Sequence, residues 1–111
     1  MNWIDLISAD QLTEIKELSI TRPQVIFKHS TRCGTSSMIK NRLERDKQPE
    51  NCDFYFLDLV KYRSLSNKIA LDFAVSHKSP QVLLIKNMEC VYEESHNGIR
   101  MDELAEQILA I

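Results

Sequence analysis

Two short apolar runs, at residues 25–27 and 54–57, constrain the fold of this chain more than any other feature. Both faces of the second run are apolar, which is typical of a strand covered on both sides. Residues 37–46 lie between the runs and residues 64–73 follow them, and both segments carry apolar residues at helical spacing. This alternation predicts parallel strands joined by crossover helices.

The pattern changes in the last third of the chain. Residues 81–86 and 89–93 are two predicted strands, and a connection of only two residues makes them an antiparallel hairpin. Residues 101–109 then carry an apolar helical stripe. Near the other end, Ser8 and Gln11 have the spacing of a capping box, which predicts the start of the first helix.

These elements predict an α/β fold with a mixed β-sheet, made of a parallel βαβ unit and an antiparallel hairpin and flanked by helices. A chain of 111 residues can bury one core, so we expect a single domain spanning 1–111. Trp3 and Ile4 fit either a short additional strand or a packed arm.

Composition and charge exclude several function classes. The formal net charge of −2 argues against a general nucleic-acid binder, which needs a concentrated basic surface. No apolar run approaches the ~20 residues that cross a bilayer, and the N-terminus lacks the basic and apolar regions of a signal peptide. We therefore expect a cytoplasmic protein without a membrane partner, and nothing in the sequence demands more than a monomer.

The cysteines point to a reducing compartment. Cys33, Cys52 and Cys90 are an odd and widely spaced set, which is a poor disulfide framework. No CxxC pair or close His/Cys cluster is present, so we expect no structural metal site.

Cys33 lies where a predicted strand ends and a predicted helix begins. Unpaired helix N–H groups and the positive end of the helix dipole favour a thiolate at this position, and the thiolate is the reactive form of cysteine. Arg32 and Lys28 add positive charge nearby, and we expect Gly34 to allow a tight turn beside the sulfur. The position predicts redox or nucleophilic chemistry at Cys33.

The order of these elements resembles the thioredoxin fold, with a reactive cysteine at a helix start and Ser79-Pro80 directly before the hairpin. Cys33-Gly34-Thr35-Ser36 is similar to the CxxC active site with serine in place of the second cysteine, and to the CGxS motif of monothiol glutaredoxins. The segments TRCGTSS and HKSPQVLLIKN, with the chain length, resemble the monothiol bacilliredoxin family more narrowly.

The resemblance implies a monothiol thiol–disulfide oxidoreductase with Cys33 as its catalytic residue. Ser36 cannot attack a mixed disulfide as a second cysteine would, so Cys33 would hold a thiol cap until another thiol removes it. Bacillithiol would be the co-substrate, S-thiolated cytosolic proteins would be the clients, and no cofactor would be tightly bound. Helix capping is the structural alternative for Ser36.

The resemblance also implies a binding site for the small thiol. Ser79 and Pro80 look like the family's cis-proline segment, which brings the backbone alongside the catalytic sulfur. Asn97 and Gly98, with Asp102 close behind, occupy the place where glutaredoxin-like proteins bind the small thiol; a left-handed turn before a helix explains the same residues.

Several roles stay open at this point. Cys52 or Cys90 could resolve the mixed disulfide, or each could be a small core or surface residue, and free thiol is the other resolving agent. His29 could orient or deprotonate Cys33, or it could be a solvated strand-end residue. Arg32 and Lys28 could hold a carboxylate of the small thiol, or they could be ordinary surface charge.

Two other function classes compete with the oxidoreductase. One is an iron–sulfur carrier in which Cys33 of two subunits and two small thiols hold a [2Fe–2S] cluster. Thr35 stands where such carriers usually have phenylalanine, which weakens that alternative. The other is a thioredoxin-like binding module without turnover.

Overall fold

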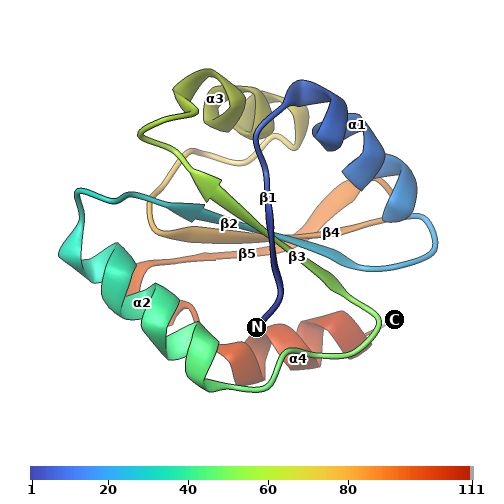
Figure 1. The fold of residues 1–111 in the computed structure, drawn as a ribbon. Coiled ribbons are helices and arrows are strands. Elements are labelled where there is room, and N and C mark those ends of the chain that lie inside the picture. The colour runs from blue at the N-terminus through green and yellow to red at the C-terminus, as the bar shows by residue number, and fades with distance from the viewer. Residues whose placement is uncertain (111) are drawn as a thin grey trace.

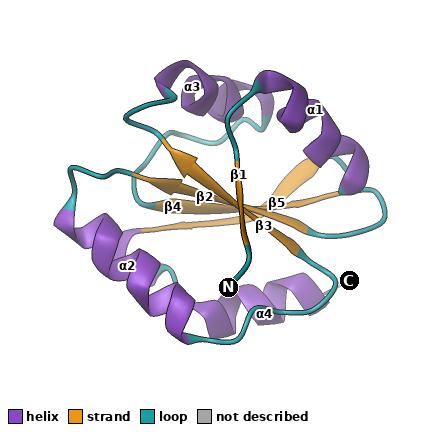
Figure 2. Ribbon diagram, in the orientation of Figure 1, coloured by secondary structure: helices purple, strands orange, loops and turns teal. Residues whose placement is uncertain are grey.

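The strands form one mixed sheet in the computed structural model, which describes residues 1–110. The sheet order is β1-β3-β2-β4-β5, with β1, β3 and β2 parallel and β4 and β5 antiparallel (Figure 2). The strands are β1 Trp3–Asp5, β2 Gln24–His29, β3 Asp53–Asp58, β4 Gln81–Lys86 and β5 Glu89–Ser95. The predicted parallel unit and hairpin are confirmed.

The helices cover both faces of this sheet. They are α1 Ala9–Leu18, α2 Gly34–Arg45, α3 Arg63–Asp72 and α4 Met101–Leu109, with a short 3-10 helix η1 at His96–Gly98. Helices α1 and α3 lie on one face, and α2 and α4 lie on the other (Figure 1). Ser8 and Gln11 form the predicted capping box at the start of α1.

Alternating residues of the central strand β2 supply the two cores. Val25 and Phe27 pack in the cluster under α2 and α4, whereas Ile26 packs in the cluster under α1 and α3. A strand buried on both faces must be apolar in both registers, which is why residues 25–27 form a continuous apolar run. Lys28 continues the alternation on the α1 and α3 side and is also fully buried.

The structure adds detail at the element boundaries. Trp3 and Ile4 form the edge strand β1, where the Trp3 ring stacks on Phe27 at 5.6 Å between centroids. Helix α2 begins at Gly34, earlier than predicted, because Cys33 in extended conformation serves as its N-cap. Ser36 was the candidate helix cap, but here it lies in the first turn.

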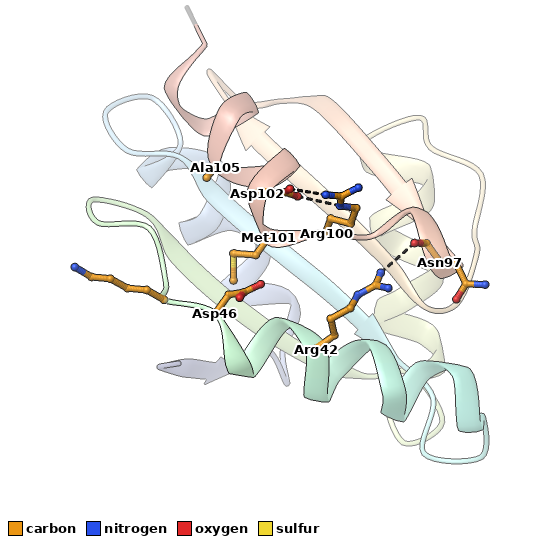
Figure 3. Close-up of a pocket in the computed structure, with 8 residues that line it drawn as sticks. Arg42, Asp46, Asn97, Arg100, Met101, Asp102 and Ala105 are labelled. Carbon is orange, nitrogen blue, oxygen red and sulfur yellow. Dashed lines mark hydrogen bonds and ion pairs between the residues drawn. The ribbon is translucent and has the colours of Figure 1, made fainter.

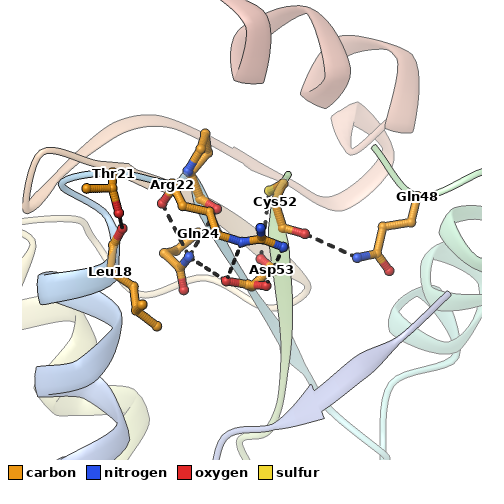
Figure 4. A network of polar contacts seen from close by, with 8 residues as sticks. Leu18, Thr21, Arg22, Gln24, Gln48, Cys52 and Asp53 are labelled. Atoms are coloured by element: carbon orange, nitrogen blue, oxygen red, sulfur yellow. Dashed lines mark hydrogen bonds and ion pairs between the residues drawn. The ribbon is translucent and has the colours of Figure 1, made fainter. Parts of the chain in front are cut away.

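A polar network lies at the end of the sheet where β2 and β3 start (Figure 4). Arg22 donates to both oxygens of Asp53 at 3.0 Å, and Gln24 Nε2 donates to Asp53 Oδ2 at 2.7 Å. Gln24 and Asp53 are also backbone neighbours in the parallel register. The network therefore supports the register of β2 and β3 at the end of the sheet opposite the Cys33 loop.

Among residues 1–110, no helix is both long and apolar enough to span a membrane.

Candidate active site at the start of helix α2

Cys33 connects the end of strand β2 to helix α2. It is the N-cap residue, with φ −115° and ψ 117°, and its side chain makes no capping hydrogen bond. The first N–H groups of an α-helix have no partner within the helix. These groups are therefore available to stabilise a thiolate at Cys33, which is half-buried.

The loop before Cys33 is closed by its own backbone. The Cys33 N–H donates to the Ser30 carbonyl at 3.2 Å, and the Arg32 N–H donates to Ser30 Oγ at 3.3 Å. Arg32 is exposed, so its charge lies at the surface next to Cys33. Gly34 is exposed and Thr35 is half-buried in the first turn of α2.

The expectation for Gly34 was wrong. No described glycine has a positive φ, and a Cβ built on Gly34 meets nothing within 4 Å. Because Gly34 is already the first residue of α2, it has helical backbone and the turn is made by residues 30–33. The missing side chain leaves open space beside the sulfur instead.

Ser36 has a different structural role from the predicted helix cap. It is fully buried in the first turn of α2, where its Oγ accepts the Ser30 N–H at 3.1 Å and lies 2.8 Å from His29 Nδ1. Because the Ser30 N–H already donates to this oxygen, the hydroxyl hydrogen is free to donate to Nδ1. In either tautomer of His29, this contact ties the reactive loop to strand β2.

His29 is not a solvated strand-end residue. It is 5% exposed, and its ring packs against Phe27 and Phe56 at centroid distances of 5.9 and 5.1 Å. Burial lowers the pKa of His29, and the charge of Lys40 lowers it further. His29 Nδ1 is hydrogen-bonded to Ser36 Oγ, so His29 supports the loop through that hydroxyl.

Ser79 and Pro80 lie at the same end of the sheet as the Cys33 loop. Lys28 pairs with Gln81 in the antiparallel register, so His29 and Pro80 are the next residues along the two strands. The Ser79-Pro80 bond is cis, as the family resemblance implies. Pro80 is buried, and its carbonyl accepts the His96 N–H at 3.0 Å, which brings the start of η1 to the same end.

The predicted turn at Asn97-Gly98 is shifted along the chain. His96 has the left-handed φ of 55°, whereas Gly98 has no positive φ. Gly98 instead gives room to the Glu94 side chain, whose Cδ would lie 2.6 Å from a Cβ at that position. Asn97 and Gly98 belong to η1, and α4 begins three residues after it.

A groove of about 660 Å³ between α2 and α4 includes Asn97 in its lining (Figure 3). Arg42 donates to the carbonyls of Asn97, at 3.0 Å, and of Ile99. Arg100 pairs with Asp102, another residue of the groove lining, at 2.6 Å. Arg42 is nine residues beyond Cys33 in α2, which corresponds to roughly 13 Å along the helix. The groove is therefore separate from the immediate surroundings of Cys33.

Lys28 does not add charge to the surface beside Cys33, as the sequence suggested. Its side chain is 0% exposed and lies on the opposite face of the sheet from Ser36, where Nζ donates to the Ser66 carbonyl at 3.1 Å. Nζ also lies 3.3 Å from His77 Nδ1. Burial lowers the pKa of Lys28 to about 8. It cannot hold a carboxylate of a small thiol at the surface.

Cys52 and Cys90 lie at the end of the sheet opposite Cys33. Cys52 directly precedes the start of β3, and Cys90 pairs with Ile85, which pairs with Gln24 at the start of β2. The five residue steps along β2 correspond to roughly 16 Å, whereas Cα atoms of a disulfide lie within about 7 Å. Neither thiol can resolve a mixed disulfide on Cys33 within this fold.

Burial also makes both of these thiols poor nucleophiles. It raises the pKa of Cys52 to about 12 and raises the pKa of Cys90. A thiol with a raised pKa has little thiolate near neutral pH, and the thiolate is the nucleophile. Cys33 is thus the cysteine whose position favours reaction.

Sequence reasoning missed the polar contacts of Lys28 with Ser66 and His77, because they join three distant segments. The available signal was a lysine directly after the apolar run at residues 25–27. Within residues 1–110, no three His, Cys, Asp or Glu side chains gather as a metal site.

Comparison with known families gives one family match. The model of the family described as "Monothiol bacilliredoxin BrxC" matches residues 4–104. This match covers the Cys33 loop, Ser36 and the Ser79-Pro80 segment.

Solved structures show the same fold. A structure described as a candidate oxidoreductase with a thioredoxin fold is 29% identical, with a TM-score of 0.80 over 93% of this chain and 90% of that chain. Thioredoxin from Malassezia sympodialis (Mala s 13) is 20% identical, with a TM-score of 0.73 over 96% and 88%. Thioredoxin from Trypanosoma brucei brucei is 14% identical, with a TM-score of 0.75 over 96% and 87%. The predicted thioredoxin-like fold is confirmed.

Proposed function

This chain belongs to the monothiol bacilliredoxin family, and on that premise we propose that it removes bacillithiol from mixed disulfides on proteins through Cys33. The family and the thioredoxin-like fold support a thiol redox role. One observation carries the finer proposal. Cys33 occupies a helix start without a side-chain cap, and the other two cysteines lie at the opposite end of the sheet.

In the first step, the Cys33 thiolate attacks the bacillithiol sulfur of the client's mixed disulfide. A disulfide forms between Cys33 and bacillithiol, the client disulfide breaks, and the client sulfur leaves as a thiolate that takes a proton from water. The free N–H groups at the start of α2 stabilise the attacking thiolate. The step transfers the cap without net oxidation of the pair of proteins.

In the second step, an external thiol regenerates Cys33. The thiolate of a second bacillithiol attacks the sulfur of the bound one, so that bacillithiol disulfide forms and Cys33 leaves as a thiolate. Two low-molecular-weight thiols thereby become oxidised, and the client thiol is the reduced product. Ser36 cannot replace the external thiol, because a hydroxyl forms no disulfide.

We propose the binding roles on the basis of position. Exposed Arg32 would contact an acidic group of the small thiol next to Cys33, and the backbone of Ser79 with Pro80 would receive the mixed disulfide. Asn97 and Gly98 would contribute through η1, which is held to Pro80 by the His96 N–H and to α2 by Arg42. We propose that the protein acts as a monomer without a tightly bound cofactor.

The test is intact mass spectrometry after mixing the reduced protein with a bacillithiol-capped client. Wild type is expected to gain one bacillithiol, and Cys33→Ser is expected to gain none. The matched control, Cys52→Ala/Cys90→Ala, keeps only Cys33 and should gain the cap at the wild-type rate. A client left capped by wild type, or transfer that requires Cys52 or Cys90, would refute the monothiol mechanism.

A further inference from the structure

Two buried polar side chains stand next to each other on the otherwise apolar sheet face under α1 and α3. Lys28 on β2 and Gln81 on β4 are direct partners in the antiparallel register, and both are 0% exposed. The next pair on the same face, Ile26 and Leu83, is part of the apolar cluster. The polar pair therefore marks the end of the sheet from which the Cys33 loop leaves.

Both side chains reach the segment at residues 76–79, which connects α3 to β4. Lys28 Nζ lies 3.3 Å from His77 Nδ1. Gln81 Nε2 donates to the Ser76 carbonyl at 3.1 Å, and Gln81 Oε1 accepts the Lys78 N–H at 3.4 Å. Three consecutive residues of the segment are thus held by two side chains from the sheet. We call Lys28 and Gln81 the polar clamp.

The α3 helix completes the clamp. Lys28 Nζ donates to the Ser66 carbonyl at 3.1 Å, and Ser66 Oγ lies 3.3 Å from the same His77 nitrogen. Lys28 therefore joins β2, α3 and the 76–79 segment at one point. Ser79 does not anchor the segment itself, because its buried Oγ has no hydrogen-bond partner.

The clamp is a costly way to fill this space. A buried ammonium group loses its hydration, and here its two partners are a neutral carbonyl and an imidazole rather than a carboxylate. A methionine of similar length would fill the site without that cost. Removal of Lys28 would also leave no new orphan, since His77 keeps Ser66 Oγ as a partner. Fold stability alone does not account for a lysine here.

We propose that Lys28 and Gln81 are positioning residues, which hold the 76–79 segment so that the backbone before Pro80 receives the mixed disulfide beside Cys33. The identity of the mixed disulfide rests on the proposed function. The polar clamp itself is a property of the fold and does not depend on that function. Neither side chain touches the reacting sulfur atoms in this role.

The first measurement tests the clamp without any substrate. In Lys28→Met and Gln81→Met, the NMR backbone order parameters of residues 76–79 are expected to fall from about 0.85 toward 0.6, while those of α2 stay unchanged. Lys68→Met is the matched control, because Lys68 lies on α3 with its side chain 49% exposed. Order parameters that stay at the wild-type value in both clamp variants would overturn the inference.

The second measurement tests positioning. Bacillithiol transfer from a capped client is expected to slow about five- to tenfold in Lys28→Met, the factor that the loss of one net hydrogen bond to the segment represents. Gln81→Met loses two hydrogen bonds to the segment and should slow transfer at least as much. The rate at which iodoacetamide alkylates Cys33 should stay within about twofold of wild type, because a small reagent needs no docking backbone. A higher melting temperature of Lys28→Met beside its slower transfer would exclude unfolding as the cause.

Two results would contradict positioning. If a clamp variant has a mobile 76–79 segment but still transfers bacillithiol at the wild-type rate, the clamp has no part in the reaction. Alkylation slowed as much as transfer would show that Lys28 acts on the sulfur itself. If wild type takes no bacillithiol at all, the proposed function fails, and a cysteine-capped peptide disulfide then serves as substrate for the same comparison.

Discussion

Replacement of Lys28 by methionine should change how the stability of the protein depends on pH. Burial lowers the pKa of Lys28 from 10.5 to about 8, and its side chain is 0% exposed. A difference of this size corresponds to about 3 kcal/mol, at about 1.4 kcal/mol for each pH unit. This is the penalty for keeping Lys28 charged in the folded protein.

The sign follows from proton binding. Between pH 8 and 10.5 the unfolded chain keeps the Lys28 proton and the folded chain has lost it, so stability rises with pH in this window. The penalty is fully present below pH 8 and disappears above 10.5. Lys28→Met carries no such penalty and should be the more stable protein at pH 7, with the wild type regaining about 3 kcal/mol relative to it by pH 10.5.

Other groups titrate over the same range and must be subtracted. Burial raises the pKa of Cys52 and of Tyr55 to about 12, and both changes lower the stability of the fold as pH rises. They are common to wild type and variant, so they cancel in the difference. The pKa of His77 is lowered below its usual 6.5 by burial and by the charges of Lys28 and Arg63, which places its titration outside the window.

The assay is urea unfolding of wild type and Lys28→Met at intervals from pH 7 to 10.5, with the free energy of unfolding obtained by linear extrapolation. Lys68→Met is the control for removal of a lysine from an exposed position. A difference between wild type and Lys28→Met that is flat with pH would refute the argument, since Lys28 would then be held equally well in both protonation states.

Four further predictions concern the reactive loop and its cysteines. Ser36→Ala leaves the Ser30 N–H and His29 Nδ1 without their partner, so urea unfolding should show a loss of roughly 1–3 kcal/mol; a loss below 0.5 kcal/mol would mean that water replaces the hydroxyl. Ser36→Cys should convert the stable Cys33 adduct into an internal disulfide, seen by intact mass, and a persistent adduct would contradict this. Gly34→Ala should raise stability by about 0.4–1 kcal/mol, because the backbone is helical and the space is open; a decrease would contradict that geometry. Native protein should take one iodoacetamide, on Cys33, whereas unfolded protein takes three; rapid native labelling of Cys52 would contradict its burial.

Much of the fold was predictable because it depends on local patterns. Apolar runs at residues 25–27 and 54–57, separated by a helical stripe, require parallel strands that are covered on both faces. The two-residue connection between residues 86 and 89 requires an antiparallel hairpin. The strand-to-helix position of Cys33 and the serine three residues later are likewise readable along the chain.

Only the tertiary structure decided which distant residues meet. The strand register placed Cys52 and Cys90 at the end of the sheet opposite Cys33, which a sequence separation cannot reveal. Helix packing buried Ser36 against His29, so a residue expected as a cap became a tie between helix and strand. Lys28 looked like surface charge because lysine usually is. Its burial follows from the sheet alternation and from α3 and the 76–79 segment closing over it. Hydrophobic periodicity, a local property, thus determined the elements, and the pairing of those elements in space determined the surroundings of each site residue.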